Sequence, residues 1–426
     1  MTINALRGTY DICPPASYIW EYVEQEARRL FGQFGYGEIR TPIFEETRLF
    51  TRSIGENTDI VSKEMYTFAD RKGRSITLRP EATAPVVRAF LQHKLYSVSP
   101  LNKFFYIGPM FRYERPQAGR NRQFYQLGTE ILGSNHPYYD AESIALAHQF
   151  LCVIGINNPT VKINSVGDLE SKKLFGKMIQ TKLMPQQSLL CADCQTRLEK
   201  NPLRVLDCKN PSCKEYIKDL PRLTDNLSPA SKEHFAQVLR FLDSMNIPYV
   251  IDNCLVRGLD YYTETIFEIV HSNLGSQDAL GGGGRYNNLV EEMEGPSTGA
   301  VGFAFGIDRL VMVLEQLRPE LATDRQQLDC YILNLEPSVF TEHVALVHKL
   351  RKTGIRADIC TEEKSMKAQF RAANKLNARF VVIRGKEEIE KNIFSIKNMN
   401  EANEEKISYT DENTLFEILR ERIIKL

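Results

Sequence analysis

Arginine is concentrated in the segment 112–122, which holds Arg112, Arg115, Arg120 and Arg122. Most runs of like charge form a solvated surface, and that is one interpretation of this segment. Arg112 differs because it follows Met110 on the alternating apolar stretch "MFRYE", so that both side chains point to one face. Guanidinium is always charged and presents a two-pronged donor that matches phosphate. The pattern therefore predicts a phosphate ligand, or a buried carboxylate, beside Arg112.

Two further arginines lie in apolar surroundings. Arg309 follows the strand-like "GFAFGI" at the start of an expected helix, where the helix dipole disfavours a cation. It either pairs with a carboxylate or joins the helix N-terminus in holding phosphate. Arg257 lies in "LVRGLDYYTETIFEIV", whose alternation predicts a half-buried strand. We expect a negative group beside Arg257, unless its side chain reaches out to solvent.

Common nucleotide-binding signatures are missing from the sequence. No G-x-x-x-x-G-K-[ST] occurs, and "GGGGRY" at Gly281–Tyr286 does not fit G-x-G-x-x-G. The four glycines predict a turn that allows a ligand to approach the backbone. An anion site must therefore be built from separated arginines on an antiparallel sheet.

Four cysteines cluster in one segment. Cys191-x-x-Cys194 is followed by Cys208-x₄-Cys213, a spacing close to that of a zinc ribbon, and four thiolates can close a tetrahedral zinc site. The alternative is a set of reduced thiols in a surface insertion. Nine cysteines, an odd number, argue against a disulfide framework.

Hydrophobic periodicity predicts the helices and strands that carry these residues. Apolar residues at helical spacing predict a helix over Trp20–Phe34, followed by a strand at "YGEIRTPIFE". The stretches "KFFYIGPMFRYE" and "RQFYQLGTEILG" predict an antiparallel hairpin around the arginine-rich loop. Gln126 and Glu130 are four residues apart on its second strand, so they share a face and can meet one ligand.

The domain organisation is expected to have four parts. Residues 1–168 and 249–320 form the two parts of one domain, and 169–248 form an inserted helical module that carries the cysteines. The strand pattern resumes at Tyr249 and continues to Val270. "RPELATDRQQ" predicts a linker, and residues 327–426 alternate β-α-β-α-β, which predicts an α/β domain with a partly parallel sheet.

Composition sets the broad class of protein. Hydrophobic residues make up 42% and charged residues 25%, as in an ordinary globular protein. No run of about 18 apolar residues occurs, so no transmembrane helix or membrane partner is expected. The first residues do not resemble a secretory signal or transit peptide, which favours a cytoplasmic location. Lys plus Arg equals Asp plus Glu at 54 each, so a polyanionic partner must be bound by local patches.

The order of these motifs resembles that of class II aminoacyl-tRNA synthetases. "GYGEIRTPIFE", "FRYE" with "RNRQF", and "GFAFGIDRL" are similar to that class's motifs 1, 2 and 3. "LRGTYDI", "LVRGLDYYTETIFE" and "LGGGGRYNNLV" narrow the resemblance to the histidyl-tRNA synthetase family. "EKSMKAQFRAANKLNARFVVIRG" is similar to that family's anticodon-binding domain. The resemblance covers the whole chain and implies an α+β fold: a catalytic domain on an antiparallel sheet with flanking helices, a helical insertion and a C-terminal α/β domain.

The resemblance also implies an activity and roles. A histidine–tRNA ligase activates L-histidine with ATP to histidyl-adenylate and pyrophosphate, then transfers histidine to the 3′ end of tRNA(His). By resemblance Arg112 binds the α-phosphate, Arg309 holds the γ-phosphate, and Arg120 reaches the outer phosphates, with Mg²⁺ on the β- and γ-phosphates. Arg257 lies near the substrate carboxylate and the α-phosphate, so Arg112 and Arg257 are the expected catalytic residues and also contact histidine.

The family's histidine contacts map onto further residues. Glu130 and Tyr262 match the imidazole contacts, and a site built to hydrogen-bond a polar side chain rejects analogues strongly. The α-amino group is matched by Glu81, Thr83 and Gln126, whereas Tyr261 and Tyr286 are expected to line the pocket. Ala82 stands where the family often has glycine.

The expected partners are tRNA and a second copy of the chain. Arg115 and Gln117 lie in the motif 2 loop, which in this family meets the tRNA acceptor end. Lys364, Lys367, Arg371 and Lys375 form a predicted helical stripe opposite Met366, Phe370 and Ala373, which either faces the anticodon arm or is simply solvated. A homodimer is implied, with the Trp20–Phe34 helix and the following strand near the interface.

Two alternative functions stay open at this point. Paralogues of this family regulate ATP phosphoribosyltransferase without charging tRNA, and other class II enzymes use other amino acids. The retained arginines and the last domain argue against the first alternative, and Glu130 with the Tyr261–Tyr262 pair argues against the second.

Overall fold

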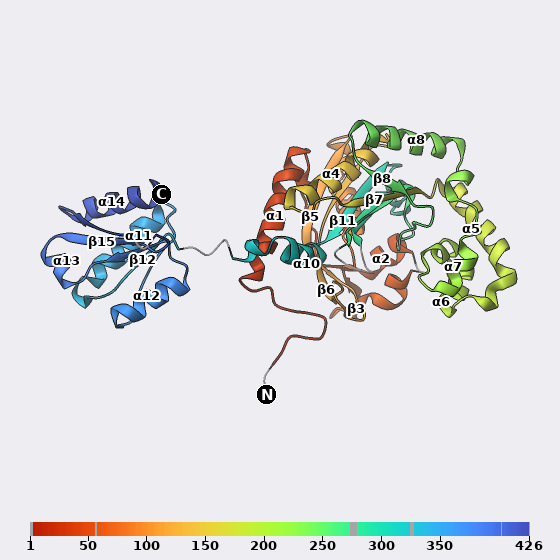
Figure 1. The fold of residues 1–426 in the computed structure, drawn as a ribbon. Coiled ribbons are helices and arrows are strands. Elements are labelled where there is room, and N and C mark those ends of the chain that lie inside the picture. The colour runs from red at the N-terminus through yellow and green to blue at the C-terminus, as the bar shows by residue number, and fades with distance from the viewer. Residues whose placement is uncertain (1–2, 56–57, 273–278, 324–327, 402, 426) are drawn as a thin grey trace. The chain divides into compact units, whose positions relative to one another are not determined.

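The computed structural model describes residues 3–55, 58–272, 279–323, 328–401 and 403–425. The chain forms two compact units, Met1–Ala322 and Thr323–Leu426 (Figure 1). Of the expected linker, Pro319–Ala322 forms a short 3₁₀ turn (η7), and 324–327 lie outside the described residues. Among the residues described, no helix combines the length and the apolar character needed to cross a lipid bilayer.

The first unit is built on an eight-stranded sheet in the order β1-β5-β6-β11-β10-β9-β7-β8. Its neighbouring strands are antiparallel, except that β1 is parallel to β5 and β7 is parallel to β8. The strands are β1 (Gly37–Glu38), β5 (Asn102–Phe111), β6 (Gln123–Leu132), β7 (Thr160–Ser165), β8 (Tyr249–Ile251), β9 (Thr263–Val270), β10 (Ala279–Arg285) and β11 (Ala300–Gly306). The expected hairpin is confirmed as β5 and β6, which pair from Asn102 with Leu132 to Phe111 with Gln123.

Long helices pack against this sheet to form the main core. They are α1 (Ala16–Gln33), α4 (Tyr138–Ile154), α8 (Pro229–Ser244) and α10 (Ile307–Leu317). The α1 helix buries Ile19, Val23, Ala27 and Leu30, which recur at helical spacing as the sequence predicted. Phe31 packs its ring against Phe105, Phe150 and Phe303, with centroids 5.5 to 6.2 Å apart. The aromatic cluster joins α1, α4 and the sheet into one rigid platform.

A smaller sheet lies beside the platform. It has the order β2-β4-β3, formed by Phe44–Glu46, Ser75–Leu78 and Tyr66–Ala69, and it is accompanied by α2 (Thr47–Ile54), a π-turn (η1, Ile60–Glu64), α3 (Thr83–Gln92), η2 (Leu95–Ser97) and α9 (Leu289–Glu292). The single strand expected over Tyr36–Glu45 was wrong, because it divides into β1 and β2 around Pro42. Proline has no N–H to donate to a neighbouring strand, which accounts for the interruption.

The segment 169–227 is helical and projects at one end of the unit (Figure 1). It contains α5 (Leu169–Leu183), α6 (Ala192–Lys200) and α7 (Pro211–Ile217), joined by the 3₁₀ turns η3 (Met184–Leu189), η4 (Pro202–Asp207) and η5 (Leu223–Asn226). The next helix, α8, turns back and buries Phe235, Val238 and Leu242 in the main core. We refer to residues 169–227 as the insert.

Two assignments made from the sequence were wrong. One placed Arg257 in a strand, and the other placed the four glycines in a turn. Residues 252–262 form a loop between β8 and β9, so Arg257 lies in this loop and not in a strand. Conversely, the glycines expected to make a turn lie inside β10. A Cβ atom added to Gly283 would meet the carbonyl oxygen of Gly302 at 2.0 Å, so glycine is required by the close approach of β11.

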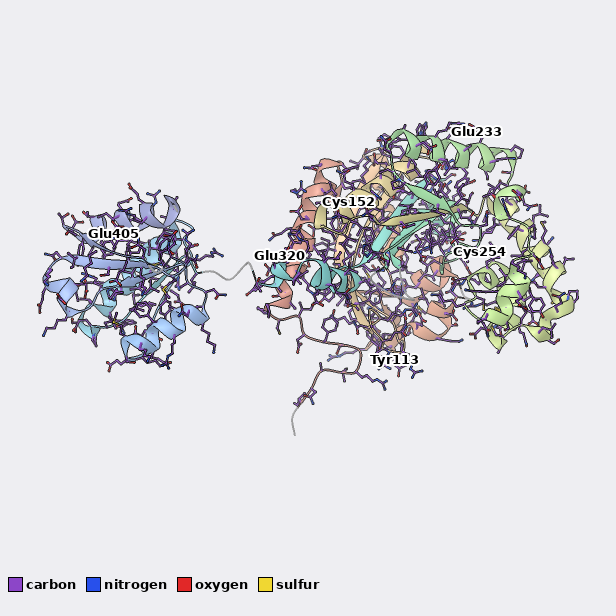
Figure 2. All side chains as sticks on the ribbon, viewed as in Figure 1. Tyr113, Cys152, Glu233, Cys254, Glu320 and Glu405 are labelled. Atoms are coloured by element: carbon purple, nitrogen blue, oxygen red, sulfur yellow. The ribbon has the colours of Figure 1, made fainter. Side chains whose placement is uncertain are left out.

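The second unit contains the expected alternation of strands and helices. Its sheet has the order β13-β12-β14-β15-β16, with β12, β13 and β14 parallel and the remaining pairs antiparallel. The elements are β12 (Cys330–Ile332), η8 (Pro337–Val339), α11 (Phe340–Lys352), β13 (Ala357–Ile359), α12 (Met366–Lys375), β14 (Phe380–Ile383), α13 (Lys386–Glu390), β15 (Ile393–Asn398), β16 (Glu404–Ser408) and α14 (Glu412–Lys425). The edge strand β16 carries exposed charges, including Glu405 (Figure 2), and charged edges discourage pairing with other chains.

Candidate active site

A cavity of about 960 Å³ opens over the strands β6, β10 and β11 of the first unit. Its walls come from the hairpin β5–β6, the start of α3, the loop 252–262, the start of α10 and the insert. The structure brings together here the residues expected to bind histidine and ATP, which are Glu81, Thr83, Arg112, Arg120, Gln126, Glu130, Arg257, Tyr261, Tyr262, Tyr286 and Arg309. The volume is that of a small-molecule site and accommodates more than one ligand.

Glu130 lies buried at the floor of the cavity, on β6. Its carboxyl accepts a hydrogen bond from the Thr83 hydroxyl at 2.7 Å and another from the Tyr286 hydroxyl. Burial raises the pKa of Glu130 to about 8 despite these donors. At neutral pH the group is therefore largely protonated and can both donate and accept a hydrogen bond, as an imidazole ring also can.

Two further polar groups lie beside Glu130. The Glu81 carboxylate accepts hydrogen bonds from the backbone N–H groups of Thr83 and Ala84, at 2.7 and 2.9 Å, at the start of α3. Burial raises the pKa of Glu81, and these two N–H donors oppose the shift. The side-chain carbonyl of Gln126 is buried and has no hydrogen-bond partner among the described residues. A ligand that donates hydrogen bonds, such as an ammonium group, would satisfy this acceptor.

Aromatic rings form one wall of the cavity. Tyr261 packs against Tyr262 and Tyr286 with centroids 4.7 and 5.5 Å apart, and all three are buried. Tyr106 of β5, which the sequence did not single out, lines the same wall. Burial raises the pKa of each of these four hydroxyls, so they stay neutral hydrogen-bonding groups.

Arg112 and Arg120 lie on either side of the Glu114 carboxylate. Arg112 follows the last residue of β5, donates from Nε to the carbonyl of Pro80 at 2.9 Å, and stacks over the ring of Phe124 at 5.2 Å. The Glu114 carboxylate is 3.8 Å from Arg112 and 3.4 Å from Arg120. The two guanidinium groups thus share the Glu114 carboxylate, and both also line the cavity.

Arg309 is held by backbone carbonyls. It donates to the oxygens of Gly119 and Ala279 at 3.1 and 2.6 Å, and no carboxylate of the described residues lies within ion-pairing distance. Burial lowers the pKa of Arg309, and repulsion by Arg120 lowers it further. These carbonyl contacts orient the side chain but leave its charge unneutralised, which favours the anion-binding interpretation over a structural ion pair.

Arg257 is fixed by Glu268 of β9, at 3.0 Å between Nη1 and Oε1. Its Nε is buried without a partner among the described residues. Burial acts to lower the pKa of Arg257, but Tyr262 and Glu268 outweigh it and raise the pKa, so the group is a permanent cation. A Cβ atom on Gly282 would lie 2.8 Å from Nη1, so this glycine makes room for the guanidinium.

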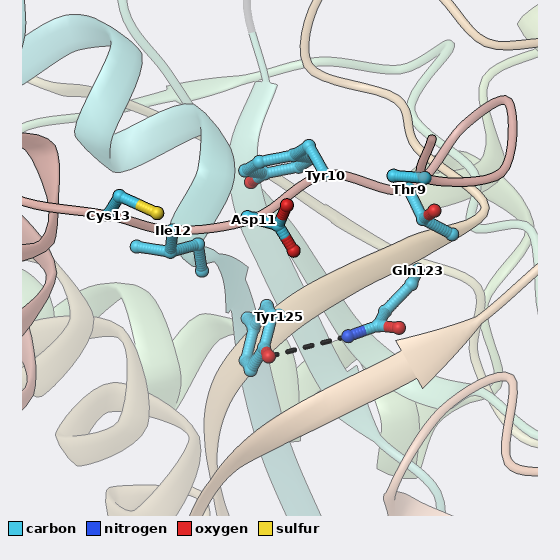
Figure 3. A pocket seen from close by; sticks show the side chains of 8 residues that line it. Thr9, Tyr10, Asp11, Ile12, Cys13, Gln123 and Tyr125 are labelled. Atoms are coloured by element: carbon cyan, nitrogen blue, oxygen red, sulfur yellow. Dashed lines mark hydrogen bonds between the residues drawn. The ribbon is translucent and has the colours of Figure 1, made fainter. Parts of the chain in front are cut away.

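Asp308, at the start of α10, joins three distant segments. Its carboxylate accepts from the hydroxyl of Tyr10 at 2.6 Å, the side-chain amide of Asn121 at 3.2 Å, and the backbone N–H of Tyr125 at 2.8 Å. Figure 3 shows how Tyr10 and Tyr125 line a shallow pocket of about 590 Å³ beside the N-terminal segment. The carboxylate therefore fixes the start of α10, and hence Arg309, to the hairpin.

The N-terminal motif "LRGTYDI" lies along the hairpin. The carbonyl of Gly8 accepts from the backbone N–H groups of Arg122 and Gln123, at 2.8 and 3.3 Å. Gly8 has φ of +87°, and a Cβ atom there would lie 2.8 Å from the Arg122 side chain. Only glycine combines this backbone conformation with this close approach.

The insert contacts the loop 252–262 directly. Lys172 donates to the carbonyl oxygens of Asp260 and Tyr262 at 2.6 and 3.1 Å, and Asn201 donates to the Asp260 carboxylate at 2.6 Å. Arg204 lies beside Gly258 and lines the cavity, as does Cys254, which is labelled in Figure 2. The insert thus forms part of the active-site wall and supports the loop that carries Arg257.

The remaining expected site residues lie elsewhere. Arg115 and Gln117 are exposed on the loop between β5 and β6 and do not line the cavity. In the second unit Lys367, Arg371 and Lys375 are exposed on α12, but Lys364 precedes the helix. The buried residues of α12 are Gln369 and Ala373, whereas Met366, at the start of the helix, is 45% exposed.

Several functional residues were missed by sequence reasoning. Tyr106 shares a strand face with Met110, so the alternation that identified Arg112 would also have found it. Glu268 is paired with Gly282 across β9 and β10, a relationship that only the sheet register reveals. Lys172 and Asn201 had no sequence signal, because their contacts depend on how the insert folds back.

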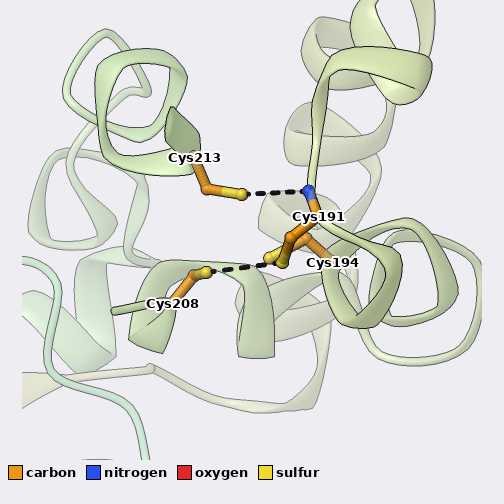
Figure 4. A group of neighbouring side chains, drawn as sticks. All are labelled: Cys191, Cys194, Cys208 and Cys213. Atoms are coloured by element: carbon orange, nitrogen blue, oxygen red, sulfur yellow. Dashed lines mark hydrogen bonds between the residues drawn. The ribbon is translucent and has the colours of Figure 1, made fainter. Parts of the chain in front are cut away.

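The clustered cysteines do come together in space. The sulfur atoms of Cys191, Cys194, Cys208 and Cys213 all lie within 4.8 Å of one another (Figure 4).

Comparison with known proteins bears on both units. A family model described as histidyl-tRNA synthetase matches residues 8–310, and one described as anticodon binding domain matches residues 329–420. A protein from Halothermothrix orenii named histidine–tRNA ligase is 49% identical over 94% of this chain and 95% of its own length. One of the same name from Clostridioides difficile is 45% identical over 99% of this chain and 100% of its own.

A solved structure is similar over the same range. The crystal structure of apo histidyl-tRNA synthetase from S. aureus superposes with a TM-score of 0.82 at 38% identity, and the match covers 98% of this chain and 100% of that one.

Proposed function

The chain belongs to the histidyl-tRNA synthetase family, and from this premise we propose how its cavity performs the reaction of a histidine–tRNA ligase. This reaction joins L-histidine to ATP, releases pyrophosphate, and passes the histidyl group to the 3′ end of tRNA(His). The observation that carries the proposal is that one cavity holds both the buried Glu130 group and Arg112, Arg257 and Arg309. These arginines come from distant parts of the sequence, so only the fold unites them.

Histidine binds at the floor of the cavity in this proposal. Its imidazole ring lies between Glu130 and Tyr262, where the protonated Glu130 carboxyl donates to one ring nitrogen or its carboxylate accepts from the other. The α-amino group lies near Glu81, Thr83 and Gln126, and satisfies the unpartnered Gln126 carbonyl. Tyr261 and Tyr286 close the pocket around the side chain. A competing amino acid whose side chain lacks a ring N–H would leave Glu130 and its neighbours unpaired. This cost provides selectivity for histidine.

ATP binds against the arginine side chains that line the cavity. Arg112 contacts the α-phosphate, Arg309 the γ-phosphate and Arg120 the outer phosphates, because guanidinium presents two donors to a phosphate group. Mg²⁺ enters as part of the ATP substrate, on the β- and γ-phosphates. The Glu114 carboxylate between Arg112 and Arg120 would offer a hard oxygen ligand to this ion.

The chemical steps then follow from position and charge. A carboxylate oxygen of histidine attacks the α-phosphorus, the bond to the β-phosphate oxygen breaks, and pyrophosphate leaves. Negative charge increases on the α-phosphate oxygens, where Arg112 and Arg257 stabilise it. A ribose hydroxyl at the 3′ end of tRNA next attacks the acyl carbon, and AMP leaves with the bonding electrons. Both steps depend mainly on orientation and on fixed charges.

Transfer RNA is engaged by both units in this proposal. Arg115 and Gln117, exposed on the hairpin loop, contact the acceptor end through phosphate and base edges. The exposed cations of α12 contact the anticodon arm. Accordingly we divide the chain into a catalytic domain in two parts (1–168 and 249–320), an inserted segment 169–248, and the anticodon-binding domain (327–426). The inserted segment comprises the insert (169–227) and the helix α8, which packs on the catalytic core.

We further propose a homodimer, and a cytoplasmic location. The apolar side of α1 is buried within its own unit, whereas Ile43 and Phe44 just after it are 43% and 52% exposed, and Phe68 on the same small sheet is 49% exposed. Such a patch suits an interface between two copies. All nine cysteines are free, as expected in a reducing compartment. Light scattering at several concentrations tests the dimer, because a constant monomer mass contradicts it.

Histidine-dependent exchange of labelled pyrophosphate into ATP tests the central proposal. Exchange should require histidine and should not need tRNA, since it reports only adenylate formation. Alanine, glutamine and other amino acids serve as controls. Exchange with another amino acid would indicate altered specificity. No exchange at all would leave the regulatory alternative, in which histidine is bound but not activated.

A further inference from the structure

The geometry of the cysteine cluster suits a metal ion. The sulfurs of Cys191 and Cys208 are 3.8 Å apart, and all four sulfurs lie within 4.8 Å of one another. Zinc binds thiolate sulfur at about 2.3 Å, so the sulfurs of an ideal tetrahedral site are about 3.8 Å apart. Cys194, Cys208 and Cys213 are buried and Cys191 is half-buried, so the sulfurs face one another out of bulk solvent (Figure 4). We propose that these four cysteines bind one zinc ion.

Other interpretations of the cluster fit less well. A disulfide requires sulfurs about 2.05 Å apart, and all four thiols are free. An iron–sulfur cluster spreads its cysteine ligands over several iron atoms, whereas these sulfurs surround a single point. Four soft thiolate ligands within reach of one ion are typical of a structural zinc site, which leaves no open position for a substrate.

Backbone groups already support the sulfurs. The backbone N–H of Cys191 donates to the Cys213 sulfur at 3.2 Å, and the backbone N–H of Asn210 donates to the Cys208 sulfur at 3.4 Å. Donors of this kind orient metal ligands and stabilise the negative charge of thiolates. Buried sulfurs that are only packed against one another would not need such donors.

The ion would join elements that cannot be stable alone. Cys191 and Cys194 lie at the start of α6, Cys208 directly follows η4, and Cys213 lies in α7. The helices α6 and α7 have 9 and 7 residues, which is too short for independent helix stability. A zinc ion therefore fixes α6, η4 and α7 relative to one another.

The same elements contact the active-site loop 252–262. Asn201, between α6 and η4, donates to Asp260, and Arg204 of η4 lies beside Gly258. Cys191 and Cys208 themselves line the cavity. The zinc ion accordingly acts as a positioning element for the loop that carries Arg257, Tyr261 and Tyr262, and takes no part in the chemistry.

Metal content and cobalt spectroscopy test the site without any substrate, so their outcome is independent of the proposed function. The full-length protein, purified without added metal and dialysed, should contain one zinc per chain by mass spectrometry. Replacement with Co²⁺ should give the intense sulfur-to-cobalt charge-transfer bands and the visible bands of a tetrahedral thiolate site. Cys194→Ser and Cys213→Ser should lose both signals, and Cys152→Ser, a half-buried cysteine outside the cluster, should keep them.

Two results would overturn the proposal. In the first, the wild-type protein contains no zinc and also gives no cobalt–thiolate spectrum. In the second, it contains iron in place of zinc. The wild-type cobalt spectrum decides the matter even if the serine variants fail to fold. For the positioning role, zinc is removed by a chelator and Mg²⁺ is restored before the exchange assay. The KM for histidine should then rise by up to about 100-fold, because displaced loop residues no longer hold the substrate in position. An unchanged KM in zinc-free enzyme would contradict the link to the loop.

Discussion

The guanidinium of Arg257 donates to the carboxylate of Glu268 across 3.0 Å, from a loop to the neighbouring strand β9. Gly282 lies opposite Glu268 on β10 and leaves the space that the guanidinium fills. Three segments of the chain thus determine where this one positive charge lies. The arrangement holds the cation before substrate arrives, which is how a fixed charge stabilises a transition state without rearrangement.

Substitution of Arg257 tests this role. Arg257→Ala should lower the kcat of histidine-dependent exchange by about 10²- to 10³-fold, with a much smaller change in the KM for ATP, because the charge acts mainly on the developing transition state. Arg257→Lys should restore little of the lost activity. An ammonium group is a point charge and lacks the planar two-pronged donor with which arginine can contact Glu268 and the substrate together. Glu268→Gln keeps an acceptor and should lose less activity than Arg257→Ala. Near-normal turnover of Arg257→Ala would show that the assigned role is wrong.

The buried Glu130 carboxyl predicts a dependence of stability on pH. Its pKa is about 8 in the folded protein, against about 4.3 in the unfolded chain. The folded state binds more protons over this interval, so this group's contribution to the free energy of unfolding is full below about pH 4.3 and is lost as pH rises towards 8. Glu130→Gln should remove the dependence. Urea denaturation of both proteins from pH 5 to 8 checks this, and parallel profiles would contradict it.

Glu130→Gln should also affect substrate selection. Thr83 donates to one carboxyl oxygen and Tyr286 to the other, and the amide N–H₂ that replaces one of these oxygens cannot accept that bond. The kcat/KM for histidine should fall by more than about 10²-fold, while ATP binding, measured separately by equilibrium dialysis, should stay near that of the wild type. A variant that charges histidine normally would remove Glu130 from the imidazole site.

The glycine run offers a test with a matched control. Gly282→Ala would bring a Cβ within 2.4 Å of the Phe267 carbonyl oxygen and 2.8 Å of Arg257 Nη1, so both stability and exchange activity should fall. Gly32→Ala, in the last turn of α1, meets nothing within 4 Å and should stabilise the protein slightly, by less than about 1 kcal/mol, through helix propensity. Thermal denaturation and exchange kinetics of both variants separate local crowding from a general effect of removing glycine.

Helix α12 predicts a salt-dependent tRNA contact. Lys367→Ala and Arg371→Ala should each weaken tRNA binding and reduce the slope of log affinity against log salt concentration by about 1, because each removes one phosphate contact. Pyrophosphate exchange, which needs no tRNA, should not change. Lys352→Ala, an exposed cation on α11, is the control. Unaltered tRNA affinity in both α12 variants would identify the stripe as a solvated surface.

Much of this arrangement could be predicted from local patterns. The β5–β6 hairpin and the helix α1 follow from alternation and from helical spacing, because their apolar faces pack on the main core. The segment around Arg257 resembles a strand in sequence for the same reason. Leu255, Val256, Tyr261 and Tyr262 are buried, so the segment has the apolar content of a strand, but they pack into a core shared with α3 and the insert and do not pair in the sheet. The sequence does not distinguish these two ways of being buried.

The glycines of β10 show a second limit. Alone, four successive glycines are typical of a turn, because glycine permits unusual backbone angles. Here glycine is required because β11 and β9 approach the backbone of β10 closely. This approach could be predicted only from the order of the strands in the sheet. The support that Lys172 and Asn201 give to the loop was invisible for a related reason. Lys172 and Asn201 both contact Asp260, from which they are separated by 88 and 59 residues along the chain.

The bond between Tyr10 and Asp308 joins residues separated by 298 positions. On a ribosome that adds 5 to 20 residues per second, about 15 to 60 s pass between the synthesis of these two residues. During this interval the N-terminal segment has no carboxylate to dock on, and the start of α10 does not yet exist. A nascent chain therefore lacks Asp308 and Arg309, and with them part of the cavity wall, until about three quarters of its length has been translated.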